Sequence, residues 1–577
     1  MPRANETVEA LLSEYAELMS ISGGDPFRVR TYEKAARSIG GYHADVSTLD
    51  LKGLLGIPSV GKSTAEKVVE YLRTGEIAAV EQLRARVPAG VRQLIAIPGL
   101  GPKKAMVLYE EMGIASVEEL AEAIEGGRLQ GLKGFGSKTE ENILHGIQRM
   151  QTAGGRVLIG VAMDLAEEIV AELSQVPGCE RCTYAGSLRR MAETIGDIDI
   201  LVASDDPVPV MDRFVALPGV EEVIARGETK TSVRTDRGLQ VDLRVITMGV
   251  WGAALQYFTG SKAHNIRIRE LAVRGKLKLS EYGLFDAESG DLIVAETEEE
   301  VYERLGMPWI PPALREDRGE VQAALAGELP DLIQERDVRG DLHTHTDLTD
   351  GLASLEQMIE SARGRKYAYY AVTDHAPNLY MQRMTDAKML AQRERVRKLQ
   401  ASGAAGRMIL LHGSELNIDP EGNVDWGPEF LEGFDGPLVA SIHSDFTQSK
   451  DDMTRRLVRA CENPHVNIIG HPTTRMIGKR GPIDFDLDEV FAAAARTGTA
   501  LEVNAYPDRL DLKDEHILWA RRHGVKFAVD TDSHSTVHLP FMRFGVATAQ
   551  RGWLTKGDVI NTWPLGRLRA FLRKGRR

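Results

Sequence analysis

Three aspartates have the spacing to hold divalent cations for phosphoryl transfer. Asp197 and Asp199 stand two residues apart in the strand-like run GDIDIL, and Asp242 lies in a second such run, QVDLRV. Because alternate residues of a strand face the same side of its sheet, the first two carboxylates share a face. A bare D-x-D pair is more often a solvated strand end. With a third carboxylate on a neighbouring strand, the set suits two hard cations bound through oxygen.

A short segment before these aspartates has the groups to hold phosphate. Gly186 and Ser187 are followed by Arg190, and Gly196 comes directly before the first aspartate. A glycine lets the backbone approach a ligand closely, a hydroxyl donates a hydrogen bond, and a guanidinium offers a charged fork. The whole pattern predicts nucleotidyl transfer, in which one cation activates a 3′-hydroxyl and the other holds the triphosphate and the leaving pyrophosphate.

A second set of metal-ligating residues lies in the C-terminal third, where most of the 14 histidines are found. Several stand at the ends of predicted strands, where a barrel of parallel strands places its chemistry. Imidazoles combined with carboxylates suit Zn²⁺, Mn²⁺ or Fe²⁺ rather than Ca²⁺. A single buried histidine is more often a hydrogen-bonded core residue, but a repeated set predicts a metal centre. The nine positions are His343, His345, Asp350, His375, Glu415, His443, His471, Asp532 and His534.

The N-terminal part contains three similar turns, each leading into a predicted helix. Each has an apolar residue, a G-x-G or S-x-G pair and a lysine at the helix start. The outward-facing N–H groups of such a turn, with the helix dipole, bind phosphate without reading bases. One copy is an ordinary helix–turn–helix connector, whereas three copies favour contact with a DNA backbone. The candidate contacts are Gly56, Val60, Gly61, Gly99, Gly101, Lys103, Gly134, Gly136 and Lys138.

The elements that must position these residues change along the chain. Apolar residues recur at helical spacing over residues 1–50. After residue 154 a predicted helix is followed by the strand-like runs IDILVAS, VEEVIARG, KTSVRT and LQVDLRVI, which indicate a sheet. Residues 251–316 read as mostly helical. From residue 337 short apolar strands alternate with helices, which favours a barrel of parallel strands with helices outside.

Composition limits the class of protein. A length of 577 residues corresponds to roughly four domains, and 43% hydrophobic residues exclude a disordered chain. No apolar run approaches the ~18 residues of a membrane helix, and the polar N-terminus differs from a secretory signal. Three cysteines cannot form a disulfide framework. We therefore expect a cytoplasmic protein without a membrane partner.

The net charge of −13 by itself argues against a nucleic-acid binder. However, basic residues are concentrated locally. Residues 51–109 contain nine Lys or Arg against four Glu and no Asp, and residues 567–577 contain six basic residues and no acidic one. Contact with nucleic acid through these regions is therefore compatible with the composition.

The three aspartates Asp197, Asp199 and Asp242 and their flanking residues resemble the nucleotidyltransferase domain, called the palm, of family X DNA polymerases. Polymerase beta is a familiar member of this family. The run YFTGS resembles the family's segment beneath the sugar and base of the incoming nucleotide. The resemblance implies that Tyr257, Phe258, Gly260 and Asn265 contact this nucleotide. It also implies that Tyr257 opposes a ribose 2′-hydroxyl, which favours deoxynucleotides.

Some positions depart from the animal members of the family. Gln240 stands where they have an arginine two residues before the third aspartate, and Lys262 stands where they have an aspartate near the base. The three turns resemble helix-hairpin-helix motifs of DNA repair proteins. In the first, Lys67 aligns with the Schiff-base lysine of the family's 5′-deoxyribose-phosphate lyase. Because Ser63 replaces a companion basic residue, a phosphate-contacting or solvated lysine is the alternative.

The nine C-terminal positions resemble the ligands of the PHP (polymerase and histidinol phosphatase) family of metal-dependent phosphoesterases. The resemblance implies three ions, held by His343, His345, Glu415 and Asp532, by Glu415, His443 and His471, and by Asp350, His375 and His534. Some members have His where Asp350 stands. Since no ligand position is lost, we expect a competent phosphodiesterase. The segment NAYP at residues 504–507 is expected to be a loop at the rim of this site, with no role indicated.

The two resemblances cover nearly the whole chain, and their order matches bacterial family X DNA polymerases. They imply a multidomain α/β fold with a mixed-sheet palm and a distorted (β/α)7-type barrel. The expected domains are an N-terminal helical domain at 1–85, a fingers-like domain with two hairpins at 86–153, the palm at 154–248, a thumb at 249–316, a linker at 317–336 and the PHP domain at 337–577.

The implied function is a bifunctional DNA repair enzyme. The palm would fill gaps with two Mg²⁺ or Mn²⁺ ions, and the PHP domain would act as a 3′-5′ exonuclease with up to three Mn²⁺ or Zn²⁺ ions. Abasic-site cleavage and removal of 3′-phosphates would extend this second activity. The expected partners are gapped or nicked duplex DNA and dNTPs, and we expect a monomer.

Three alternatives stay open at this point. The polymerase half could be a DNA-binding platform for a single phosphoesterase, against which the complete aspartate set weighs. The chain could be a scaffold that recruits other repair proteins, against which two complete ligand sets weigh. A transferase acting on RNA ends would share the palm chemistry, but Tyr257 and the three hairpins favour DNA.

Overall fold

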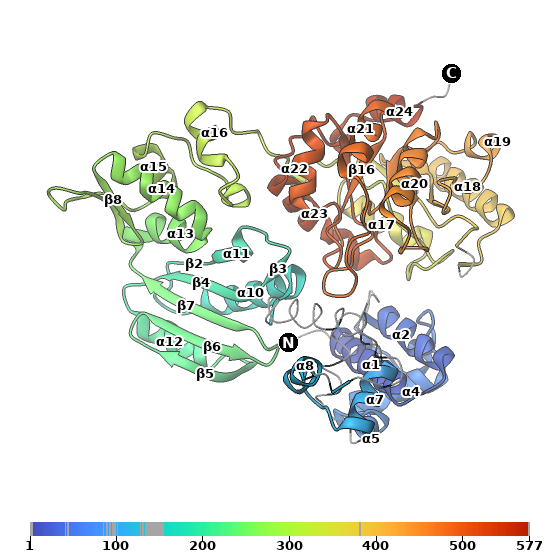
Figure 1. The fold of residues 1–577 in the computed structure, drawn as a ribbon, viewed down its shortest axis with the longest axis horizontal. Coiled ribbons are helices and arrows are strands. Elements are labelled where there is room, and N and C mark those ends of the chain that lie inside the picture. The colour runs from blue at the N-terminus through green and yellow to red at the C-terminus, as the bar shows by residue number, and fades with distance from the viewer. Residues whose placement is uncertain are drawn as a thin grey trace.

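A computed structural model gives the fold (Figure 1). It describes residues 155–379 and 382–574 and, before them, residues 4–40, 42, 45–84, 86–87, 91, 94, 100, 102–126, 128–129, 132, 135 and 143. Among the described residues, no helix has the length and apolarity that crossing a membrane requires. The N-terminal helices, drawn in blue, lie below the orange and red C-terminal barrel in Figure 1, and the green palm and thumb lie to the left.

The N-terminal part is helical, as the periodicity predicted. Its buried apolar side chains, among them Leu12, Ile39 and Val68, form one core. Helix α4 ends at Gly75, whose φ of 80° provides the left-handed turn that glycine adopts at least cost. The elements are α1 (Ala4–Ile21), α2 (Pro26–Gly40), η1 (Val46–Thr48), α3 (Leu51–Leu55), α4 (Lys62–Thr74), α5 (Ala78–Arg84), α7 (Pro102–Met112) and α8 (Val117–Glu125).

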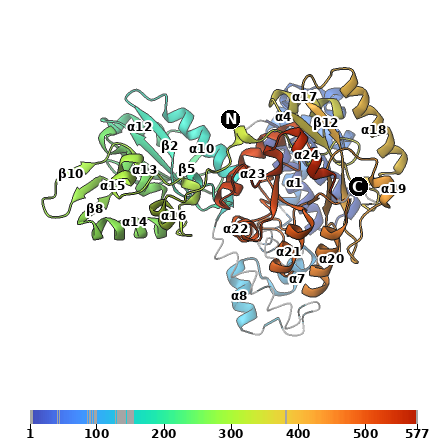
Figure 2. The same cartoon turned by 90° about the horizontal axis from the view of Figure 1, so that it is seen from above.

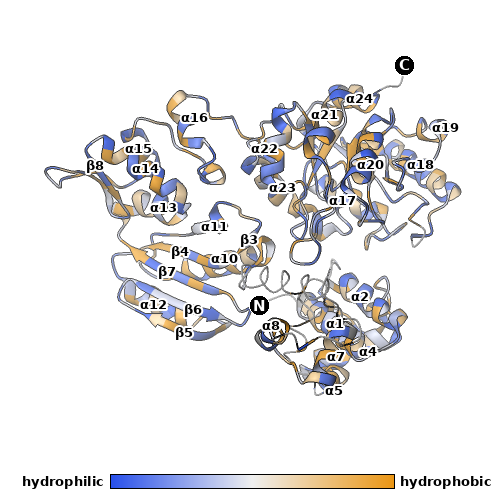
Figure 3. Ribbon diagram, viewed as in Figure 1, coloured by the Kyte–Doolittle hydropathy of each residue, from blue (hydrophilic) through white to orange (hydrophobic). Residues whose placement is uncertain are grey.

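The palm is a five-stranded mixed sheet in the order β2-β4-β7-β6-β5. Strands β4 and β7 are parallel, and the other neighbours are antiparallel. Polar and apolar residues alternate along β7, so that one face packs on the core (Figure 3). The elements are β1 (Val157–Leu158), α10 (Ile159–Leu173), β2 (Arg181–Tyr184), α11 (Gly186–Arg189), β3 (Thr194–Ile195), β4 (Asp197–Ala203), α12 (Pro207–Val215), β5 (Val220–Arg226), β6 (Lys230–Thr235) and β7 (Gln240–Ile246).

The thumb region is less helical than the sequence predicted. A three-stranded antiparallel sheet, β10-β9-β8, follows its first two helices. Strands of three or four residues joined by a tight turn are too short for a period of two to show in the sequence. The elements are η2 (Met248–Val250), α13 (Trp251–Thr259), α14 (Lys262–Arg274), β8 (Leu277–Ser280), β9 (Gly283–Asp286), β10 (Leu292–Val294), α15 (Glu298–Arg304) and η3 (Pro312–Leu314).

The C-terminal part contains the parallel strands that the sequence predicted, with helices between them. The elements are α17 (Leu355–Gly364), β11 (Tyr369–Val372), α18 (Asp386–Ala401), β12 (Ile409–His412), β13 (Ser414–Asn417), α19 (Pro428–Leu431), β14 (Leu438–Ser441), α20 (Lys450–Glu462), β15 (Ile468–Ile469), α21 (Leu487–Thr497), β16 (Ala500–Asn504), α22 (Asp514–Arg522), β17 (Lys526–Asp530), η6 (Thr536–Phe541), α23 (Met542–Arg551), η7 (Ile560–Thr562) and α24 (Leu565–Leu572).

These strands form a parallel barrel. Strand β11 pairs with β12, and β13 to β17 form a five-stranded parallel sheet in chain order. Parallel bridges from Thr344 to Ser533 and from His375 to Glu415 connect the remaining edges. Because parallel strands of a barrel end at the same rim, the residues that follow them are brought together. The segment expected to be a linker contains α16 (Glu320–Ala326), and η4 (Glu335–Asp337) begins at its end.

The palm packs directly against the barrel, where α10 and α23 lie near each other in Figure 2. Leu510 and Phe544 of the barrel belong to the same apolar core as the palm helices. Arg475 donates to Glu193 at 2.7 Å, and Arg543 donates to Glu167 at 2.8 Å. The two halves are therefore joined by an apolar contact with ion pairs around it.

Candidate active sites

The palm sheet brings the three predicted aspartates to one edge. In the parallel ladder of β4 and β7, Asp199 lies directly opposite Asp242, and Asp197 lies opposite Gln240. Burial and the charges of Asp197 and Asp242 raise the pKa of Asp199 to about 7. Such mutual repulsion between carboxylates is what bound cations relieve, so the donor set fits divalent cations.

Asp242 has two positively polarised neighbours that sequence reasoning did not find. The Lys230 ammonium on β6 lies 2.7 Å from Asp242 Oδ2, and the Gln240 amide donates to Oδ1 at 2.8 Å. Although burial opposes the effect, hydrogen bonds from Lys230 and Gln240 hold the pKa of Asp242 below its ordinary value. Lys230 thus supplies, from the adjacent strand, the positive charge that Gln240 lacks. Antiparallel pairing of the runs KTSVRT and QVDLRV is the signal in the sequence that could have indicated the contact between Lys230 and Asp242.

The predicted phosphate segment lies beside Asp199. Gly186 begins the short helix α11 with a φ of 59°, and a Cβ at this position would come within 2.2 Å of Asp199 Oδ2. Only glycine therefore allows the backbone to pass so close to the carboxylates. Arg190 is held near the thumb, since it donates to the Thr259 carbonyl at 2.6 Å and to Glu316 at 3.1 Å.

The predicted nucleotide segment lies at the end of α13. Asn265 donates to the Tyr257 carbonyl at 2.7 Å and accepts from Gln256 at 2.8 Å, so its amide fixes the local backbone. Tyr257 and Phe258 meet edge to face with ring centres 5.2 Å apart. A Cβ on Gly260 would meet Arg190 at 3.3 Å, which places this segment next to the phosphate segment. Gly196 similarly lies close to Arg156.

The first hairpin is described in full. Val60 is buried, and Gly61 is the N-cap of α4 with an extended backbone. Gly56 ends α3. The predicted contacts Gly99, Gly101, Gly134, Gly136 and Lys138 lie outside the described residues; of Lys103 only the backbone, in α7, is described.

Lys67 lies in a small aromatic enclosure of the first helical domain. Its ammonium is 5.4 Å from the centre of the Tyr15 ring and 5.5 Å from that of Tyr32, and it donates to Ser63 at 3.2 Å. Although burial opposes the effect, the hydrogen bond with Ser63 and the charge of Lys67 lower the pKa of Tyr32. Ser63 thus connects the two groups, because its hydroxyl lies within hydrogen-bond distance of both.

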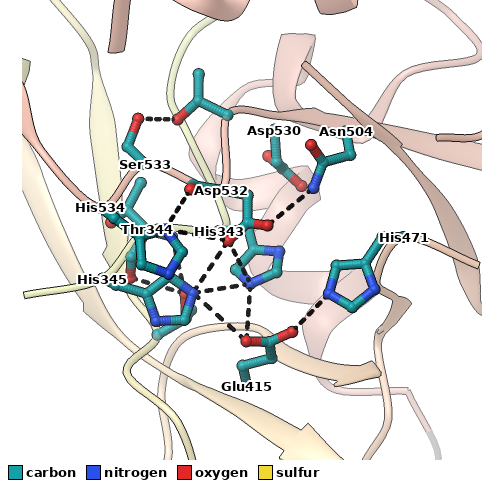
Figure 4. A network of polar contacts seen from close by, with 12 residues as sticks. His343, Thr344, His345, Glu415, His471, Asn504, Asp530, Asp532, Ser533 and His534 are labelled. Carbon is teal, nitrogen blue, oxygen red and sulfur yellow. Dashed lines mark hydrogen bonds and ion pairs between the residues drawn. The ribbon is translucent and has the colours of Figure 1, made fainter. Parts of the chain in front are cut away.

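All nine C-terminal positions meet at one rim of the barrel. Figure 4 shows six of them: His343, His345, Glu415, His471, Asp532 and His534. Glu415 lies at the centre. His471 Nε2 and His443 Nε2 are 3.0 and 3.2 Å from its Oε1, and His375 Nδ1 is 2.9 Å from its Oε2. Figure 4 shows His343 and His345 directed at Glu415 from the opposite side, below Asp532.

This histidine cluster, as we call the nine residues, fits divalent cations. Three groups place ligand atoms within 4.8 Å of one another: His345, Asp350, His375 and His534; His343, His345 and Glu415; His375, Glu415 and His443. Buried atoms including His345 Nδ1 and Asp350 Oδ1 form no hydrogen bond. The grouping differs from that implied by the family resemblance, because His345 and His375 each belong to two groups. Assignment of ligands to individual ions stays a prediction.

Residues behind the cluster orient it, and the sequence prediction missed them. The buried Glu502 carboxylate accepts from His343 Nδ1 at 2.6 Å, which leaves Nε2 directed at the cluster. Asn504 donates to Asp532 at 3.1 Å, and Asn417 bonds His443 Nδ1 at 2.8 Å. Such carboxylate and amide partners fix the tautomer and direction of metal-binding histidines. The alternation in LEVN, which directs Glu502 and Asn504 to one side of β16, was the available signal.

A known protein is similar to this chain over nearly its whole length. The DNA polymerase/3′-5′ exonuclease PolX of Bacillus subtilis is 37% identical over 567 residues, which cover 98% of this chain and 98% of that protein. This chain is a family X DNA polymerase with a PHP domain. Seven of the nine residues of its histidine cluster lie within residues 341–505, which match the PHP domain.

Other comparisons match separate parts of this family X polymerase. Family models match at residues 3–77 (helix-hairpin-helix domain), 91–149 (SAM-like helix-hairpin-helix tandem), 254–316 (DNA polymerase beta thumb) and 341–505 (PHP domain). DNA polymerase lambda of Rattus norvegicus is 26% identical over 51% of this chain and 53% of its own length. A probable phosphatase of Thermoanaerobacter sp. (strain X514) is 27% identical over 41% of this chain and 95% of its own.

Proposed function

We propose that this family X polymerase fills gaps in duplex DNA and removes nucleotides from 3′ ends in its PHP domain, in base excision repair and related end processing. The observation that supports the proposal is the coexistence of two sets of candidate cation ligands in one chain. Asp199 and Asp242 lie in register in the palm, and the nine residues of the histidine cluster meet in the barrel. Its substrates are gapped or nicked DNA and dNTPs, and it acts as a monomer.

In the palm, Asp197, Asp199 and Asp242 would hold two Mg²⁺ or Mn²⁺ ions, which lower the pKa of the attacking hydroxyl and offset charge on the triphosphate. The close backbone at Gly186 and the hydroxyl of Ser187 bind phosphate oxygens, and Arg190 supplies a guanidinium.

The edge of α13 selects the sugar. Tyr257 excludes a ribose 2′-hydroxyl by its position, and Asn265 keeps the Tyr257 backbone in place through the 2.7 Å hydrogen bond to its carbonyl. Phe258 packs against the guanidinium of Arg244, 4.7 Å from its ring centre, so this edge is fixed to β7.

In the PHP domain, the histidine cluster would hold up to three Mn²⁺ or Zn²⁺ ions, which activate water and offset charge on the leaving oxygen. The chain's own part is to fix the ligands before substrate arrives. Glu502 holds His343, Asn504 holds Asp532, and Asn417 holds His443. The same site would cleave at abasic sites and remove 3′-phosphates, since each reaction breaks a phosphoester at a DNA end or strand.

Metal content distinguishes this proposal from a non-catalytic scaffold. The protein is stripped with a chelator, dialysed against Mn²⁺ and analysed for bound metal, together with an Asp199→Asn/Asp242→Asn double variant. We expect the double variant to lose the palm ions and keep the barrel ions. In the stripped wild-type protein, gap filling and 3′ degradation should both return on adding Mn²⁺. A protein that binds no ion and processes no DNA end would overturn the proposal.

A further inference from the structure

A cavity of about 1260 Å³ lies beside the histidine cluster. The cluster residues Asp350, Asp532 and His534 form part of its wall, and α1, α2 and α10 line it from other sides. Pockets for a single small ligand measure ~300–1,000 Å³, so this cavity has room for more than one such ligand. A DNA end therefore has the space to enter and reach the cluster.

Three aromatic side chains form a continuous surface in this cavity, which we call the aromatic shelf: Tyr506, His538 and Phe541. The rings of His538 and Phe541 are stacked at 5.4 Å, and Tyr506 meets both edge to face at 5.0 and 5.2 Å. All three rings are only partly buried, so they present surface to the cavity. Single-stranded nucleic acid is commonly bound by stacking its bases on such side chains.

An arginine in the wall of the same cavity lies beside the cluster. Arg509 Nε is 3.9 Å from Asp532 Oδ2, and its buried Nη1 forms no hydrogen bond. The neighbouring Arg480 differs, because it donates to the Thr474 carbonyl through two nitrogens. A guanidinium N–H without a partner, next to cation ligands, suits a phosphodiester oxygen.

One loop carries both features. Tyr506 and Arg509 belong to the segment AYPDR, which follows β16. Asn504 fixes this loop to the cluster, because its Oδ1 accepts from the Tyr506 amide at 3.0 Å and its Nδ2 donates to Asp532 at 3.1 Å. Any group bound by the loop therefore has a defined position relative to the cluster.

We propose that the aromatic shelf and Arg509 form a subsite for the 3′-terminal nucleotide of DNA, whose base stacks on the shelf while Arg509 binds the phosphodiester. This inference rests on the proposed 3′-5′ exonuclease function. Lys34 and Arg37 of α2 line the same cavity and provide positive charge for the preceding phosphates. The N-terminal helical domain thereby contributes to a site whose chemistry belongs to the barrel.

Binding without catalysis tests the stacking directly. A single-stranded oligonucleotide carrying 2-aminopurine at its 3′ end is titrated with protein in the presence of a chelator. Stacking on the shelf should quench the fluorescence, and Tyr506→Ala should lose most of this quenching while Tyr506→Phe keeps it. Tyr282→Ala, which changes a thumb tyrosine that is 60% exposed, is the matched control. Equal quenching in the Tyr506→Ala variant would overturn the role of the shelf.

Kinetics separate the base from the phosphate. For degradation of the oligonucleotide with Mn²⁺, Tyr506→Ala should raise KM about tenfold. The same variant should not change KM for an oligonucleotide that ends in an abasic tetrahydrofuran residue. Arg509→Ala should weaken binding of a normal end but not of one with a terminal methylphosphonate linkage, which lacks the anionic oxygen. Arg496→Ala, a surface arginine paired with Glu462, is the control.

Two kinds of failure can be told apart. If the wild-type protein degrades neither the normal nor the abasic oligonucleotide, the proposed exonuclease function is wrong. The wild-type protein could instead degrade both oligonucleotides, with the Tyr506→Ala and Arg509→Ala variants showing the same KM as the wild type on each. In that case the proposed nucleotide subsite is wrong, although the exonuclease function is right.

Discussion

At the residue scale, the chemistry depends on side chains that hold the ligands in place. The spacing of D-x-D and the repeated histidines is local, so the sequence predicted the ligand candidates themselves. Their partners are distant in the chain: Glu502 lies 159 residues from His343, and Lys230 reaches Asp242 from a neighbouring strand. Contacts of this kind follow from the register of the strands, which local periodicity does not determine.

Replacing Glu502 with glutamine tests this positioning. An amide cannot stabilise the His343 Nδ1–H as a carboxylate does, so the apparent affinity of the PHP site for Mn²⁺ should fall roughly 10- to 100-fold. The measurement is 3′ degradation as a function of Mn²⁺ concentration, with gap filling by the same variant as internal control. Unchanged Mn²⁺ dependence of degradation would show that Glu502 does not orient the ligand.

At the element scale, strand order and register assemble the palm edge. The sequence predicted β4 to β7 because their runs are long and rich in branched residues. It missed the short thumb strands β8 to β10, because the turn between β8 and β9 interrupts the pattern after four residues. The parallel pairing of β4 with β7, which sets Asp199 opposite Asp242, required the fold.

The pairing of β6 with β7 gives a second prediction. Lys230→Ala removes the ammonium 2.7 Å from Asp242, so this carboxylate loses its charged partner. We expect about a tenfold lower kcat for gap filling, as for loss of one charge-assisted hydrogen bond of ~1.4 kcal/mol. Lys230→Arg should restore much of the rate because it keeps the charge. The role of Lys230 in the palm would be contradicted if single-turnover extension by Lys230→Ala were as fast as by the wild-type protein. It would also be contradicted if 3′ degradation by this variant fell as much as extension.

At the scale of the whole molecule, the barrel contacts the phosphate segment of the palm. Arg551 of α23 donates at 2.8 Å to the Arg190 carbonyl and at 2.8 Å to Glu316, which also accepts from Arg190. Asp514 accepts from Arg551 Nε at 2.9 Å. The sequence predicted the palm and the barrel but not this contact between them. The motifs that identify each domain contain no information about the surface of the other domain.

Arg551→Ala should therefore affect the polymerase although Arg551 belongs to the barrel. Loss of its guanidinium leaves Glu316 and Asp514 with one partner fewer, and Arg190 loses the fixed neighbour of its backbone. We expect KM for dNTP to rise several-fold, with 3′ degradation of single-stranded DNA unchanged. Steady-state gap filling across a range of dNTP concentrations measures this, and Arg551→Lys should recover part of the effect. Equal KM values would show that the domain contact is only structural.

The claim that one chain contains two independent active sites is tested most directly with a single substrate. A labelled duplex with a one-nucleotide gap is incubated with Mn²⁺, with and without dNTPs, using the wild-type protein, Asp242→Ala and His343→Ala. We predict that Asp242→Ala loses extension and retains 3′ degradation, and that His343→Ala does the opposite. Normal extension by Asp242→Ala would contradict the assignment of the palm, and loss of both activities in either variant would contradict the separation of the two sites.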